Sequence, residues 1–334
     1  TDYAADPYRL TVERARAHLR GPARHPTPVW TYNRKVPGEV FRVRQGEPVT
    51  VVVANRLDEP TTVHWHGLRV AIDQDGVPGL SQAPIAPGAA HRYHFTPPDA
   101  GTFWYHPHVN TPEQVGRGLY GAFIVEEREP IQVDQDVVWI LDDWRLEDDG
   151  TIAAGFDSLH EQAHGGRMGA HVTVNSTAPS GLDVRTGERV RLRLINAANA
   201  RIFVLSFEGH TPQVIAYDGQ PVLPHPPAQG VVILGPGMRV DLIVDAVGSP
   251  GERYAIRDIA YQGQENALGA LRYATDVRRE KLLESRIALP ANPLAEPDLA
   301  NARGHELRLQ GGAMGRMREA TLDGKPLGMR ALIQ

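Results

Sequence analysis

Glycine and proline interrupt this chain so often that few segments are long enough for a helix of several turns. The 334 residues include 33 glycines and 27 prolines, which are spread along the whole sequence rather than gathered in one tract. Glycine supplies the backbone angles that turns require, and proline ends regular structure, so the uninterrupted pieces have the length of β-strands. The sequence therefore predicts an all-β chain with little helix.

Short runs of β-branched and aromatic residues alternate with these turns. Residues 41–44 and 49–53 are two such runs, separated by the turn sequence Gly46-Glu47-Pro48. Comparable runs follow at 61–66, 91–95, 102–106, 121–125 and 137–141. Short strands at this spacing are typical of β-sandwiches and barrels. The chain is also longer than an average domain, so we expect two domains.

The second half of the chain repeats the first with no net gap over its opening strands. Residues 41–49, FRVRQGEPV, align with residues 182–190, LDVRTGERV, and the same offset of 141 positions places Asn55 on Asn196. Two histidines of the first copy align with apolar residues of the second: His64 with Leu205, and His66 with Phe207. Internal duplication is the simplest interpretation, with a structural role for the second copy.

These patterns divide the chain into four parts. Residues 36–130 and 137–275 are expected to form the two sandwiches. Residues 1–35 mix arginine and alanine with acidic residues and are expected to be a solvated N-terminal arm. Residues 276–334 begin as a connector rich in proline and alanine. Within it, residues 321–327 resemble the openings of the earlier units, so we expect the start of a third unit whose remainder is missing.

Charge and cysteine content exclude several classes of function. The chain carries 35 Lys and Arg against 40 Asp and Glu, interspersed, for a net charge of -5, which favours neither nucleic acid nor an anionic membrane as partner. No apolar run approaches the length of a membrane span. The chain has no cysteine, which excludes disulfides, thiol catalysis and any copper site built on a thiolate.

Two short segments place histidines at alternate positions. His64 and His66 flank Trp65, so on a strand both imidazoles point to one face and the indole to the other. His106 and His108 repeat the spacing at the end of a strand that a proline terminates. Four imidazoles from two strand ends could converge on a cluster of metal ions, and neutral imidazole suits copper or zinc.

Several stretches of the first copy resemble the first domain of multicopper oxidases, the laccase-like enzymes. They are HWHG at 64–67, DGVP at 75–78, QAPI at 82–85, GTFWYHPH at 101–108 and GLYGAFIV at 118–125. The second copy resembles the family's second domain more loosely, through LDDW at 141–144 and GMRVD at 237–241. The resemblance implies tandem Greek-key β-sandwiches of the cupredoxin-like type, followed in the family by a third domain that this sequence lacks.

The resemblance also implies a trinuclear copper cluster, of type 2 and type 3 ions, between the first and third domains. It assigns the ligands as follows: His64 to the type 2 copper, His66 and His106 to one type 3 copper, and His108 to the other. It places Asp75 beside the cluster, as a carboxylate that orders water and helps to deliver protons. Four of the eight cluster ligands would then lie in this chain.

Members of the family couple one-electron oxidation of a small reducing substrate to four-electron reduction of dioxygen to water. The type 1 blue copper that accepts the electrons requires a thiolate, which a chain without cysteine cannot supply. We therefore expect a copper-dependent oxidase of which this chain is an incomplete, inactive part. It would need a third cupredoxin domain from the same chain or a partner. The family implies a periplasmic or secreted location, and the reducing substrate stays open among phenols, aromatic amines and metal ions.

Three other interpretations compete with this one. His160 to His164, HEQAH, matches the zinc-metalloprotease pattern, but the nearby glycines leave room for only about two helical turns, which favours a polar loop. A copper-free structural relative acting as a binding protein should have lost the cluster imidazoles, and all four are present. A two-domain copper enzyme of the nitrite-reductase or small-laccase kind would need a cysteine.

Overall fold

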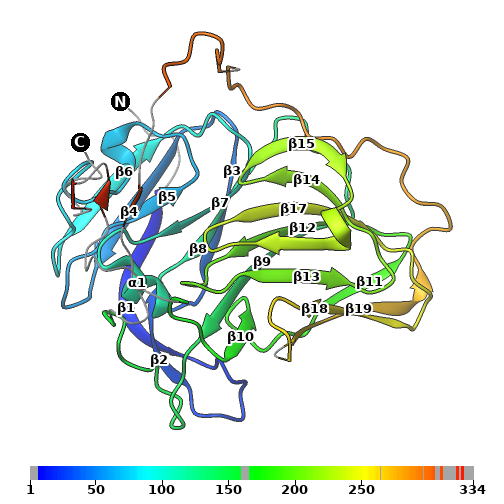
Figure 1. Cartoon of the computed structure of the whole chain (residues 1–334), viewed down its shortest axis with the longest axis horizontal. Helices are drawn as coiled ribbons and strands as arrows, with labels where there is room; N and C mark the ends of the chain where they lie inside the picture. The colour runs from blue at the N-terminus through cyan, green and yellow to red at the C-terminus, as the bar shows by residue number, and fades with distance from the viewer. Residues whose placement is uncertain are drawn as a thin grey trace.

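The regular secondary structure of the described residues is almost wholly β-strand. The computed structural model describes residues 7–158, 165–263, 265–295 and 297–304, and the short strands 309–310, 321–322 and 325–326. Within these residues the single α-helix, α1 (Thr111–Gly116), has six residues, and 3-10 turns lie at Ile72–Gln74 and Ala228–Gly230. The strands form two sandwiches side by side (Figure 1), which confirms the predicted all-β class.

The first sandwich packs two four-stranded sheets against each other. One sheet has the order β2 (Thr27–Tyr32), β1 (Tyr8–Ala17), β4 (Val49–Asn55), β6 (Ala90–Phe95). The other has the order β3 (Gly38–Arg44), β8 (Gly121–Glu126), β7 (Gly101–His106), β5 (His64–His66). β4 alternates buried Val49, Val51 and Val53 with partly exposed neighbours, as a strand on one side of a core should. The core between the sheets includes Phe41 and Trp65.

The second sandwich repeats this plan with more strands. One sheet has the order β10 (His171–Val174), β9 (Gln135–Trp144), β12 (Arg189–Asn196), β17 (Arg239–Asp245), β14 (Gln213–Tyr217), β15 (Gln220–His225). The other has the order β11 (Leu182–Thr186), β19 (Asn266–Val277), β18 (Arg253–Asp258), β13 (Phe203–Phe207), β16 (Val231–Leu234). Leu205 and Phe207, which align with the histidines of the first copy, lie in its core.

The backbone pairing confirms the internal repeat. β4 lies between β1, to which it is parallel, and β6, to which it is antiparallel. β12 lies in the same way between parallel β9 and antiparallel β17. The β1–β2 pair of the first copy therefore corresponds to the β9–β10 pair of the second.

The N-terminal segment differs from the expected solvated arm. β1 and β2 fall inside residues 1–35 and form strands of the first sandwich, where β1 pairs with both β2 and β4. Leu10 and Val12 are fully buried in the first core, while Arg14 and Arg16, farther along the same face of β1, are exposed. The core covers this face of β1 at Leu10 and Val12 but not at Arg14 and Arg16. The arginines that suggested an arm therefore belong to a strand of the sandwich.

A small third sheet is formed by β20 (Leu309–Gln310), β21 (Thr321–Leu322) and β22 (Lys325–Pro326). β21 turns back on β22 with Leu322 opposite Lys325. The earlier units have an antiparallel bridge with the same spacing of three residues at the ends of β2 and β10, between Tyr32 and Lys35 and between Val174 and Thr177. The sequence similarity of residues 321–327 to those openings therefore extends to backbone pairing.

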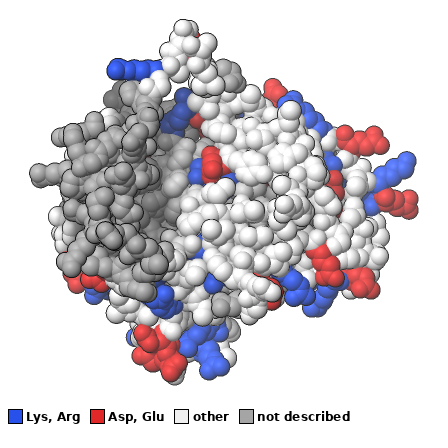
Figure 2. Space-filling model, in the orientation of Figure 1, with Lys and Arg blue, Asp and Glu red and all other residues white. Residues whose placement is uncertain are grey.

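The two sandwiches share a continuous interface. An apolar cluster joins Trp104 and Tyr120 of the first to Ile140 and Ile195 of the second. On the face shown in Figure 2, acidic and basic side chains lie interspersed along the margins. No helix in the described residues is long and apolar enough to cross a membrane.

Candidate metal centre

Strand pairing brings the two histidine segments together. β5 pairs with β7 so that His64 lies opposite His106 and His66 lies opposite Trp104. Trp65, between the two histidines, is fully buried in the first core. The imidazoles of β5 therefore point away from the core, to the face that the sequence predicted.

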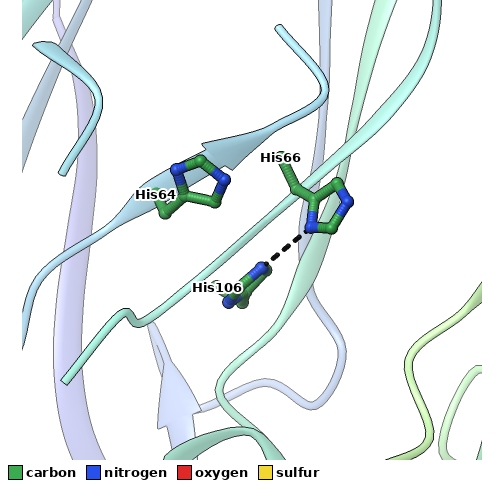
Figure 3. A group of neighbouring side chains, drawn as sticks. All are labelled: His64, His66 and His106. Carbon is green, nitrogen blue, oxygen red and sulfur yellow. Dashed lines mark hydrogen bonds between the residues drawn. The ribbon is translucent and has the colours of Figure 1, made fainter. Parts of the chain in front are cut away.

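The imidazoles converge at one edge of the first sandwich, as Figure 3 shows for three of them. The ring centroid of His64 lies 5.7 Å from that of His66 and 5.4 Å from that of His106. His66 Nδ1 and His106 Nε2 face each other at 3.2 Å. One ring nitrogen from each of the three histidines lies within 4.8 Å of the other two. The predicted convergence of these rings is confirmed.

His108 lies at the margin of this group. Its ring centroid is 5.5 Å from that of His64, but its nitrogens are not part of the tight trio. Its backbone N–H donates to the Thr62 hydroxyl at 3.1 Å, which anchors the chain just before α1. The structure thus places all four predicted histidines at one site, three of them closely packed.

Asp75 lies beside His64, after the 3-10 turn Ile72–Gln74. Nδ1 of His64 lies 2.8 Å from the main-chain oxygen of Asp75 and 3.2 Å from its carboxylate oxygen Oδ1. The following Gly76 has φ +74°, and a Cβ there would lie 1.8 Å from the carbonyl oxygen of Val63, so only glycine lets the loop approach β5 this closely. If Nδ1 carries the proton that these oxygens accept, Nε2 of His64 keeps its lone pair.

Burial keeps most of these imidazoles neutral. Burial, followed by the positive charge of Arg239, lowers the pKa of His66 to about 3. Burial and then the neighbouring His64 lower the pKa of His106 well below its usual value and also lower the pKa of His108. Nδ1 of His106 forms a hydrogen bond with the carbonyl oxygen of Pro107 at 2.8 Å, and its Nε2 faces His66. Neutral imidazole with a free lone pair is the form that binds a metal.

The histidines open into a cleft of about 330 Å³ that both sandwiches line. Trp104 packs against two of the rings, with its centroid 5.0 Å from that of His66 and 4.2 Å from that of His106. The second sandwich contributes its own wall to the cleft: Ala197, Ala198, Asn199, Pro236 and Gly237. Sequence reasoning gave the second copy a structural role and missed this wall, although Gly237 opens the GMRVD motif that it noted.

The donor set suits a transition metal that prefers nitrogen. Imidazoles bind copper, zinc, iron and nickel, and the site offers no thiolate because the chain has no cysteine. In the described residues, this trio is the one cluster of histidine or acidic side chains close enough to hold a metal ion. The HEQAH segment at 160–164 lies outside the described residues.

Three other histidines of the described residues, His91, His94 and His210, have partners outside this group. His91 contacts Tyr93 with ring centroids 4.6 Å apart, and His94 Nδ1 lies 2.9 Å from the Thr50 hydroxyl. His210 is buried, and its Nε2 lies 2.5 Å from the Tyr273 hydroxyl. None of these three belongs to the cleft.

Comparison with known proteins gives a consistent result over both sandwiches. Two family models, each described as multicopper oxidase, match residues 14–130 and 135–281. The multicopper oxidase MmcO of Mycobacterium tuberculosis is 31% identical over 322 residues, covering 88% of this chain and 59% of that protein. Laccase-2 of Botryotinia fuckeliana is 31% identical over 275 residues, covering 73% of this chain and 45% of that protein.

A solved structure shows the same similarity in three dimensions. The crystal structure of a multi-copper oxidase from Pseudomonas thermotolerans superimposes with a TM-score of 0.82 and 37% sequence identity. The match covers 91% of this chain and 72% of that one. The chain spans less than two thirds of the length of MmcO and of Laccase-2.

Proposed function

The chain belongs to the multicopper oxidase family, and on that premise we propose that its clustered histidines bind copper as part of a larger oxidase. The whole protein would couple one-electron oxidation of a small reducing substrate to four-electron reduction of dioxygen to water. The observation that carries the proposal is the pair of ring nitrogens, His66 Nδ1 and His106 Nε2, that face each other at 3.2 Å. Two nitrogens bound to one ion at about 2.0 Å in tetrahedral geometry lie roughly 3.3 Å apart.

We propose that the four histidines form half of a trinuclear type 2 and type 3 site. His66 and His106 would share one type 3 copper, His108 would bind the other, and His64 would bind the type 2 copper through Nε2. Bound copper would supply the redox chemistry: it would receive electrons from the substrate and pass them to dioxygen. Trp104 and the wall of the second sandwich cover part of His66, and His106 is buried.

We propose that Asp75 transfers protons from solvent to this site. Reduction of one dioxygen molecule to two waters consumes four electrons and four protons, so the site needs a route for protons from solvent. The Asp75 side chain is 30% exposed, and its Oδ1 lies 3.2 Å from His64 Nδ1, so the carboxylate touches both solvent and the cluster. A carboxylate in this position can take a proton from water at Oδ1 and release it toward the cleft.

The remaining ligands would come from a third cupredoxin domain, in the same polypeptide or in a partner. No cysteine occurs in the 334 residues, so the thiolate of a type 1 copper must lie outside them. We infer that these residues alone do not turn over, and that the whole protein works in the periplasm or is secreted. A copper-free binding protein is the less favoured alternative, because it has no need of three imidazoles whose ring nitrogens converge.

Copper titration of the purified chain tests the proposal. The wild-type chain should bind copper in competition with a chelator. His66→Ala and His106→Ala should each weaken binding by about 100-fold or more, since loss of even a ligand's supporting partner costs about 10- to 100-fold. His225→Ala is the control, because that partly exposed ring hydrogen-bonds to the adjacent Pro226 carbonyl and does not line the cleft. Binding that survives both cluster substitutions would contradict the proposed site.

An oxygen electrode tests the second part. The copper-loaded chain should show neither sustained oxygen uptake with a phenol nor intense blue absorbance. Both should appear when a domain that supplies the thiolate and the missing imidazoles is added. Steady turnover by the 334 residues alone would overturn the proposed division of ligands.

A further inference from the structure

The backbone of the second sandwich lies close to a proposed copper ligand, His66. Gly237 lies between β16 and β17 and has φ +80°. A Cβ at this position would lie 3.2 Å from Cε1 and 3.7 Å from Nε2 of His66. The ring of His66 therefore contacts Trp104 of the first sandwich and Gly237 of the second. The position of the Gly237 turn limits where that ring can go.

Arg239, two residues later, holds this turn. Its guanidinium donates from Nη1 to the Gly237 carbonyl at 2.9 Å and from Nη2 to the Asp218 carbonyl at 3.0 Å. The arginine is 4% exposed, and its charge is paired with the Asp218 carboxylate at 3.1 Å. The guanidinium group thus holds two turns: the one before β17, through Gly237, and the one after β14, through Asp218.

The same guanidinium reaches into the first sandwich beside the cluster. Nε donates to the carbonyl of Thr102 on β7 at 3.3 Å. A Cβ on Gly67, the residue after His66, would lie 2.1 Å from Nη2, so the guanidinium occupies the space that a side chain at 67 would need. Arg239 therefore contacts the strand that carries His106, the residue next to His66, and the turn that packs on the His66 ring.

We propose that Arg239 is a positioning residue for the histidine cluster: supplied by the second sandwich, it sets the Gly237 wall against His66 and so fixes the orientation in which Nδ1 of His66 faces Nε2 of His106. This inference rests on the proposed copper function and adds a role for the second copy within the same site. Lysine cannot replace it, because an ammonium lacks the planar fork that reaches carbonyls in three directions.

The test compares Arg239→Lys with Arg189→Lys in the full 334-residue chain. Arg189 is also buried in the second sandwich, pairs with Asp245 at 2.7 Å and donates to the carbonyls of Leu283 and Ser285, but it is not among the residues that line the cleft. Both substitutions keep the charge, lose the fork and should lower the melting temperature. Only Arg239→Lys should weaken copper binding, by about 10-fold.

A second readout needs no metal. Nitrogen-15 NMR of the imidazoles in the metal-free chain should show a changed or broadened His66 signal in Arg239→Lys, while the His225 signal stays as in the wild type. Gly237→Ala, which leaves the arginine in place and pushes a methyl group toward His66, should change the same signal. If Arg239→Lys does not fold, Gly237→Ala still tests whether the position of the Gly237 turn sets the orientation of the His66 ring.

These outcomes distinguish the positioning role of Arg239 from the proposed copper function. If Arg239→Lys is destabilised but keeps wild-type copper affinity and an unchanged His66 signal, Arg239 is merely structural. If Arg189→Lys loses as much affinity, general destabilisation explains the effect. If the wild-type chain binds no copper at all, the proposed function fails, and the His66 signal still decides whether Arg239 orients the ring.

Discussion

At the scale of single residues, two asparagines show how the repeat is maintained. Asn196 is fully buried, and its Nδ2 donates to the carbonyls of Arg201 and Leu234 at 2.8 and 3.0 Å. Its Oδ1 accepts from the Ala198 N–H at 2.9 Å. Asn55 makes the equivalent three bonds in the first copy. One amide side chain thus satisfies three backbone groups where a loop follows a strand.

Replacing Asn196 with alanine should therefore destabilise the chain strongly. The substitution leaves three loop groups without a partner in a buried place, which predicts a loss of about 2 to 4 kcal/mol in the free energy of unfolding. Urea denaturation followed by tryptophan fluorescence measures it. Asn301→Ala is the control, because Asn301 is exposed and bonds only to Asp298. Equal midpoints for the two variants would show that the amide bonds are unimportant.

The histidine site could be predicted from residues only in part. Alternation along a strand places His64 and His66 on one face and Trp65 in the core, and the structure agrees. The register that sets His64 opposite His106 depends on pairing between strands that are distant in sequence, so periodicity alone could not supply it. Gly237 and Arg239 were missed for the same reason, since they belong to the other sandwich. That His64, His66, His106 and His108 bind copper and that Asp75 moves protons stay predictions.

At the scale of secondary-structure elements, β1 and β12 show why charged strands are hard to assign. β12 alternates arginine with valine or leucine, which predicts a strand with one face in solvent, yet every one of its residues is buried. Different parts of the chain cover the arginine face: the segment with Leu283 and Ser285 covers Arg189. Glu127 lies against Arg191, and Thr102 of β7 lies against Arg193. β1 carries exposed arginines as well: Arg14 and Arg16 follow the buried Leu10 and Val12 along one face, so the charge pattern hid a strand that is only partly covered by the core. Such strands can be recognised from local sequence, but what covers each face depends on the tertiary fold.

Leu10→Ala tests whether β1 is an integral strand of the first sandwich. Leu10 is fully buried in the first core, so the substitution should lower the free energy of unfolding by about 2 to 5 kcal/mol. The adjacent Arg9 is exposed, and Arg9→Ala should change it by less than about 0.5 kcal/mol. Thermal and urea unfolding measure both. A solvated arm would make the two substitutions equally harmless.

At the scale of the whole molecule, an ion pair and the amide of Asn292 connect the two sandwiches across their interface. Arg191 of β12 lies 2.8 Å from Glu127 Oε1 and 2.7 Å from Asp241 Oδ2, and all three side chains are almost fully buried. The amide of Asn292 exchanges hydrogen bonds with the backbone of Ala100 in the first sandwich and also donates to the Gly219 carbonyl in the second. The histidine cleft lies across this interface, so its shape depends on how the sandwiches are docked.

Arg191→Ala should therefore affect both stability and copper binding. Removing the guanidinium leaves the carboxylates of Glu127 and Asp241 buried without their main cation, which predicts a loss of about 3 to 5 kcal/mol. Adding Glu127→Gln should recover part of that loss, because a neutral amide costs less to bury than an unpaired carboxylate. Differential scanning calorimetry measures each variant.

The matched control for that experiment is Arg272→Ala. Arg272 pairs with Asp183, whose side chain is 80% exposed, so its loss should cost no more than about 1 kcal/mol. Because Asp241 lies on β17, two residues beyond Arg239, loosening the network should also move the Gly237 wall and weaken copper binding by the Arg191→Ala chain, whereas Arg272→Ala should bind copper as the wild type does. Copper affinity that is unchanged in a clearly destabilised Arg191→Ala chain would mean that the first sandwich forms its half of the site independently, and that docking of the second sandwich contributes nothing to it.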